Sequence, residues 1–117
     1  MVTSTRCATP GGILQVRIAE NFLTRALGLL VGAPLGCSEG LLITPCSSIH
    51  TLGMRYAIDV VFVDREARVI RICDGVPAGR MRFSRGAQGV LELRAGSATK
   101  HGLARGVELM ELAAALG

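Results

Sequence analysis

The side chains best suited to acid and base chemistry in this sequence are His50, Asp59 and Glu92. A histidine can act as a general acid or base, and a carboxylate can orient it or carry a second proton. Asp59 and Glu92 each stand inside an apolar run, where a buried carboxylate without partners is costly in free energy. Each carboxylate must therefore lie on a solvent face or have a partner.

Two interpretations of these carboxylates remain open. In the structural one, Arg25 pairs with Asp59 or Glu92 and fixes a helix across a sheet, although such pairs often add little net stability. In the functional one, Asp59 and Glu92 converge with His50 and Thr51 in a cleft that binds a ligand or catalyses a reaction. A hydrolase-like enzyme would use His50, Asp59 and Glu92. No nucleophile elbow, phosphate loop or zinc motif accompanies them, which favours a non-catalytic role.

The cysteines argue against a metal centre. They stand at positions 7, 37, 46 and 73, and no two have the Cys-x2-Cys spacing of a zinc knuckle or a redox helix. Cys46 and His50 could supply two ligands, but nothing nearby supplies the other two that structural zinc needs. We expect no metal or cofactor, and we expect all four thiols to be free and to pack as small apolar groups.

Arginines give the second half of the chain a positive balance. The formal net charge is +4, and ten of the thirteen basic residues lie between positions 55 and 105. Arg80, Arg82 and Arg85 would contact phosphates if the protein bound nucleic acid weakly. One Tyr, three Phe and no Trp leave little for bases to stack on, so a nucleic-acid partner is not favoured.

The length of 117 residues predicts a single domain over residues 1–117, with residues 1–10 poorly ordered. Half of the residues are hydrophobic, which is enough to build a core. No stretch reaches the ~20 apolar residues of a membrane-spanning helix, and no secretory signal is visible. We therefore expect a cytoplasmic protein with no membrane span.

One helix and several short strands must position the polar residues. Apolar residues recur at helical spacing over residues 21–31, and Gly32 and Pro34 end that pattern. Strands are expected at residues 13–18, 40–44, 48–52, 58–63, 68–73, 89–94 and 107–112, and the clearest hairpin joins 58–63 to 68–73. The Ala/Leu-rich residues 109–116 fit either a strand or a short helix. The predicted fold class is α+β. It is a compact β-rich domain with a mostly antiparallel, sandwich- or barrel-like sheet and one main helix near residues 21–31.

Residues 50–64 resemble the central signature of the small bacterial and archaeal family labelled domain of unknown function 192. Residues 25–29, 40–42, 90–96 and 101–106 resemble other segments of that family, in order and at compatible spacing. The resemblance covers residues 17–109 and implies a compact β-rich fold with one or two helices. It implies no reaction. Two positions depart from the family: Leu30 replaces a common Met, and His-Thr-Leu-Gly-Met replaces an aromatic-Met-Asn-Thr sequence.

We therefore expect a non-catalytic domain that binds a small ligand or a partner protein at the face carrying residues 50–55. The candidate cleft consists of His50, Thr51, Met54, Arg55 and Asp59. The hydrolase-like enzyme is the first alternative, and the weak nucleic-acid binder is the second.

Overall fold

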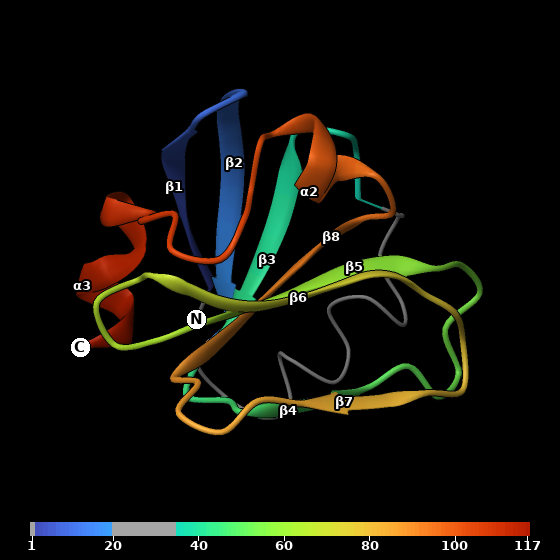
Figure 1. Cartoon of the computed structure of the whole chain (residues 1–117). Helices are drawn as coiled ribbons and strands as arrows, with labels where there is room; N and C mark the ends of the chain where they lie inside the picture. Colours follow the sequence, from blue (N-terminus) through green and yellow to red (C-terminus); the bar gives the residue numbers. More distant parts are fainter. Residues whose placement is uncertain (1, 20–34) are drawn as a thin grey trace.

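A six-stranded sheet and a two-stranded ribbon form the framework of the protein (Figure 1). The computed structural model describes residues 2–19 and 35–117, so the helix expected at residues 21–31 lies outside the described residues. The strands are β1 (Val2–Thr9), β2 (Gly12–Ala19), β3 (Glu39–Ile43), β4 (Ser48–His50), β5 (Ile58–Val63), β6 (Val69–Val76), β7 (Met81–Phe83) and β8 (Gly89–Arg94). After them come α2 (Ser97–Lys100), the 3-10 helix η1 (Met110–Leu112) and α3 (Ala113–Leu116).

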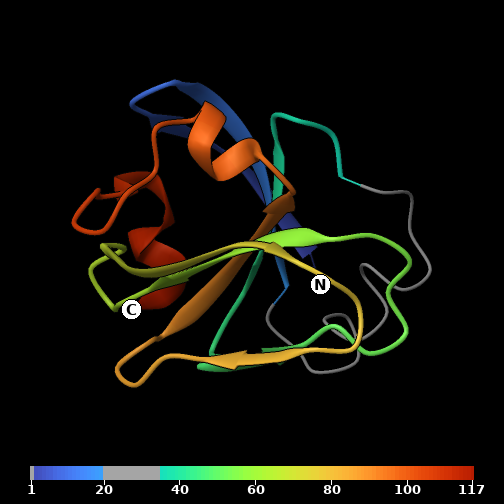
Figure 2. The same ribbon diagram turned by 45° about the vertical axis from the view of Figure 1, so that its right-hand side comes forward.

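The large sheet has the strand order β1-β2-β3-β8-β5-β6. The β2–β3 pair is parallel, and the other neighbouring strands are antiparallel. Strands β4 and β7 pair with each other to form the separate ribbon. Both views place this ribbon and α2 on opposite sides of the molecule (Figures 1 and 2). The predicted α+β class with a mostly antiparallel sheet is confirmed.

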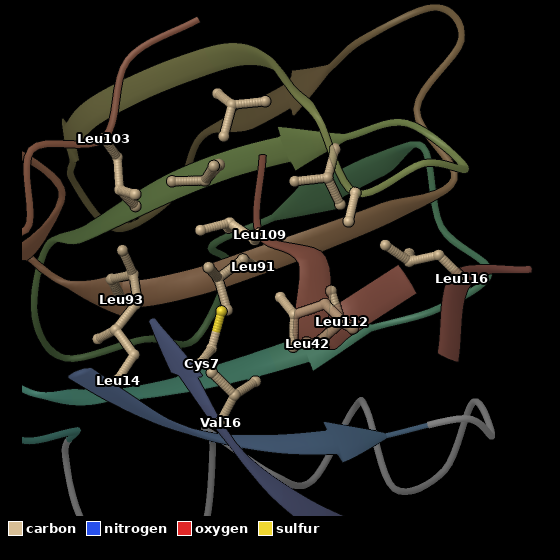
Figure 3. Packing of buried hydrophobic residues seen from close by; sticks show 14 of the residues in the cluster. Cys7, Leu14, Val16, Leu42, Leu91, Leu93, Leu103, Leu109, Leu112 and Leu116 are labelled. Atoms are coloured by element: carbon tan, nitrogen blue, oxygen red, sulfur yellow. The ribbon is translucent and has the colours of Figure 1, made fainter. Parts of the chain in front are cut away.

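The sheet buries both of its faces around β5, whose six residues are all buried. On one face, Val61 and Val63 pack in a cluster that includes Leu109 and Leu112 from the C-terminal segment (Figure 3). On the other face, Phe62 belongs to a second cluster. Half-buried residues in and beside β4, among them Cys46 and Ile49, pack against it. A strand covered on both faces needs a continuous apolar run, which the sequence supplies except at Asp59.

Strands at residues 58–63 and 89–94, and the hairpin after 58–63, are confirmed as predicted. The strand expected at residues 107–112 is wrong, because η1 and α3 follow Leu109. Leu109, Leu112 and Leu116 are all buried, and their spacing of three and then four residues is helical rather than alternating. Little order was expected in residues 1–10, yet Val2–Thr9 form β1, because the whole strand pairs with β2.

The turn between β1 and β2 docks on the end of α2 through His101. The backbone N–H of Gly11 donates to the carbonyl of His101 at 2.9 Å. The buried His101 ring lies 3.0 Å from the Thr9 hydroxyl through Nδ1 and 3.2 Å from the Cys37 carbonyl through Nε2. A Cβ added at Gly11 would stand 2.4 Å from the Lys100 carbonyl oxygen, so the turn approaches the helix too closely for any other residue.

Gly11→Ala should therefore destabilise the protein by about 1–3 kcal/mol, the usual cost of forcing atoms into a packed contact. Gly117→Ala is the matched control, because its Cβ would make only an ordinary contact, 3.6 Å from the Ala113 carbonyl oxygen. Urea unfolding of the two variants measures the difference. Equal midpoints for both variants would show that the turn is not held tightly against α2.

Candidate functional site

Asp59 is fully buried and accepts three backbone hydrogen bonds. The N–H of Gly75 donates to Oδ1 at 2.8 Å, and the N–H groups of Gly96 and Ala98 donate to Oδ2 at 3.0 and 2.9 Å. The carboxylate thus joins β5 to β6 and to the start of α2. The Arg25 predicted as its partner lies outside the described residues, within which the bonds to Asp59 come from backbone N–H groups.

Replacing Asp59 with Asn should cost on the order of 3 kcal/mol, because the amide NH2 would face backbone donors where an acceptor stood. The melting temperature should fall by roughly ten degrees. Asp74→Asn, at an exposed carboxylate on the neighbouring strand, should change it little. An Asp59→Asn protein that melts with wild type at neutral pH would show that these bonds contribute nothing to stability.

Glu92 points to the opposite face of the sheet from Asp59. In the register of β5 and β8, Asp59 lies opposite Leu93, and Val60 lies opposite Glu92. Leu93 belongs to the cluster beneath the C-terminal helices, whereas Val60 belongs to the cluster on the β4–β7 side. The prediction that Asp59 and Glu92 converge in one cleft is therefore wrong. Glu92 shares a face with Val60, and Val60 points to the opposite face from its neighbour Asp59.

Glu92 is almost completely buried, with 2% of its surface exposed. Within the described chain, its Oε2 has no hydrogen-bond partner. Burial raises the pKa of its carboxyl to about 8. The pKa of Tyr56 is also raised, first by burial and then by the charge of Glu92. Of the two carboxylates predicted as partners of Arg25, Asp59 has both oxygens bonded to backbone N–H groups, whereas Glu92 Oε2 has no partner within residues 2–19 and 35–117.

The raised pKa of Glu92 makes stability fall as pH rises. Between the ordinary value of 4.5 and the folded value of about 8, the folded chain keeps a proton that the unfolded chain releases. Wild type should therefore lose roughly 1.4 kcal/mol per pH unit across much of that window. Glu92→Gln should flatten the profile and melt above wild type at the alkaline end.

Glu66→Gln, at an exposed glutamate, should retain the wild-type profile and is the control for removing one negative charge. Thermal melts of the three proteins across this pH window provide the measurement. If Glu92→Gln melts below wild type at every pH, then the carboxylate has a cationic partner. Arg25 would then be the partner to test next by a double-mutant cycle.

The candidate cleft residues separate into buried and exposed positions. Thr51 is 1% exposed, and its hydroxyl donates to the carbonyl of Pro77 at 2.7 Å and accepts from the N–H of Arg80 at 2.8 Å. Thr51 therefore holds the end of β4 against the segment that precedes β7. Met54 is half-buried against both clusters on the β4–β7 side. Of the five predicted residues, only His50 and Arg55 are exposed.

His50 lines an open groove of about 490 Å³ beside β4. Two segments of its lining are joined directly, because the N–H of Cys46 donates to the carbonyl of Gln88 at 3.0 Å. Its lining consists of Pro45, Cys46, Ser47, Ser48, Ile49, His50, Met81, Ala87 and Gln88.

Two apolar side chains of β7 are exposed here: Met81 lines the groove, and Phe83 lies beside it. Met81 lies opposite His50 in the ribbon, and Phe83 lies opposite Ser48. Their exposed fractions are 68% and 64%. Neither residue was predicted as part of a site. No strand was expected between residues 73 and 89, whereas Met81–Phe83 form a strand because they pair with β4.

The four cysteines are free thiols with different surroundings. Cys7 is buried, and its pKa is raised to about 12 by burial and by nearby Glu111. Cys37 is exposed, so the prediction that it packs in the core is wrong. Lys100 Nζ lies 3.2 Å from Cys37 Sγ and lowers the pKa of that thiol. Cys46 and Cys73 are half-buried.

Residues 2–19 and 35–117 contain no group of three or more His, Cys, Asp or Glu side chains placed to hold a metal ion. No helix within them has the length and apolar character needed to cross a membrane.

The model of the family described as uncharacterised ACR, domain of unknown function 192, matches residues 5–110. A protein of unknown function from Novosphingobium aromaticivorans has a similar structure, with 21% identity and a TM-score of 0.76 over 92% of this chain and 83% of that chain. A "putative transcription regulator" from Sinorhizobium meliloti is also similar, with 20% identity and a TM-score of 0.77 over 92% of each chain. At these identities the similarity concerns the fold. No curated protein matches the chain.

Proposed function

The chain belongs to the family labelled domain of unknown function 192, and we propose that it is a non-catalytic domain that binds a partner protein through the β4–β7 groove. The observation that carries this proposal is the open groove beside His50, with exposed Met81 and Phe83 next to it. Exposed apolar side chains grouped around a concave surface are typical of interaction sites. Methionine and aromatic residues are also enriched at such sites.

The distribution of the polar residues supports binding rather than catalysis. Asp59 has its oxygens bonded to backbone groups on the far face of the sheet. Glu92 is buried. Asp59 therefore lies on the opposite face of the sheet from the β4–β7 ribbon that carries the exposed His50. In the hydrolase-like alternative a carboxylate orients His50 through a hydrogen bond, and Asp59 is not placed to do so.

The shape of the groove favours a segment of a partner protein over a small molecule. Its volume is within the range of ligand sites, but such sites enclose most of the ligand surface. This groove is open, and Met81 and Phe83 extend the apolar surface along the ribbon beside it. A short linear segment of another protein can cover the groove and this apolar surface at once.

Selection from a random library of short linear peptides, using the full chain, tests the proposal. The selected peptides should bind wild type and lose about tenfold in affinity on Met81→Ser, the loss of roughly 1.4 kcal/mol that defines a meaningful contact. Met110→Ser should leave affinity unchanged. Met110 is a suitable control because it is 65% exposed, close to the 68% of Met81, and lies on η1. Peptides that bind both variants equally would contradict the proposal.

A further inference from the structure

The net positive charge of the chain lies entirely in the two segments that build the ribbon. Residues 45–56 and 77–88 contain Arg55, Arg80, Arg82 and Arg85 and no Asp or Glu. The nine basic residues elsewhere are balanced by all nine acidic residues. The formal charge of +4 is therefore a property of this one layer rather than of the surface as a whole.

Backbone hydrogen bonds hold the chain at Arg80 and at Ser84, next to Arg85, against the β4 segment that lines the groove. The carbonyl of Arg80 accepts from the N–H of Thr51 at 2.8 Å, which holds Arg80 beside the His50 end of β4. The N–H of Ser84 donates to the carbonyl of Ser47, a lining residue, at 3.0 Å, and Arg85 follows directly. Both arginine side chains are exposed.

A further arginine contributes from the large sheet. The guanidinium of Arg71, on β6, donates a hydrogen bond to the carbonyl of Phe83. This contact places a cation against β7 in addition to those of the ribbon itself. The guanidinium of Arg82 donates to the carbonyl of Met81 at 2.8 Å, so a cation lies against the backbone of each apolar residue of β7.

We propose that the occupant of this groove is an acidic, extended segment of a partner protein, whose apolar side chains cover Met81 and Phe83 and whose carboxylates face Arg80 and Arg85. This inference rests on the proposed function and names the chemistry of the partner. Arginine favours carboxylates because its planar fork can donate two parallel hydrogen bonds. A single-stranded nucleic acid would meet one exposed aromatic ring here, Phe83, and stacking would be weak.

The peptide selection also tests this inference. The selected peptides should be rich in Asp and Glu, and replacing those residues with Asn and Gln should weaken binding by about tenfold. Charges at the rim of an interface act mainly on the association rate, and buried contacts act on dissociation. Arg80→Gln with Arg85→Gln should therefore slow association several-fold and reduce its salt dependence. Met81→Ser should speed dissociation.

Arg94→Gln with Arg105→Gln is the matched control, since both arginines are exposed and lie outside the ribbon segments. Neutral or basic peptides that still depend on Met81 would overturn the acidic partner and leave the proposed function intact. Peptides indifferent to Met81 would overturn both. An oligothymidylate that displaces the acidic peptides, and binds more tightly than they do at the same salt concentration, would instead assign the groove to nucleic acid.

Discussion

The hydrogen bonding of Asp59 is the constraint on which the arrangement of the sheet and α2 depends. A carboxylate in an apolar strand loses its hydration, and here three backbone N–H groups replace the water. Those donors belong to β6 and to the segment that begins α2, so one side chain fixes three elements. The end of α2 in turn holds the β1–β2 turn through His101. A polar connection therefore runs along one face of a sheet that is otherwise packed by apolar contacts.

The two faces of the sheet differ in what they leave for binding. The Asp59 face is closed by α2 and the C-terminal helices, and its buried carboxylate has its bonds satisfied. The other face has the ribbon, with an open groove and exposed apolar residues. It also has Glu92, whose burial is not offset by a partner for Oε2 within residues 2–19 and 35–117. Apolar clusters stabilise both faces, whereas the exposed surface suited to a partner lies on the ribbon side.

Charge follows the same division. Outside the ribbon segments, positive and negative residues are equal in number, so the excess of formal positive charge lies in a single layer. A localised positive patch accelerates encounter with an acidic partner, and this acceleration falls as salt is added. Apolar residues within the patch would then determine how long the partner stays. The ribbon combines both properties within a few residues.

Sequence alone determined the β-rich class, the family and the β5–β6 hairpin, because these depend on local patterns. It also determined that Asp59 must be partnered or exposed, because burying a charge is costly. Only the tertiary structure decided which groups hold Asp59. The donors are backbone amides 16 to 39 residues away, and a backbone amide leaves no mark on residue type. Strand register likewise decided that Asp59 and Glu92 point apart. The groove joins residues near 45–50 to residues 81–88, and no local spacing predicts that pairing.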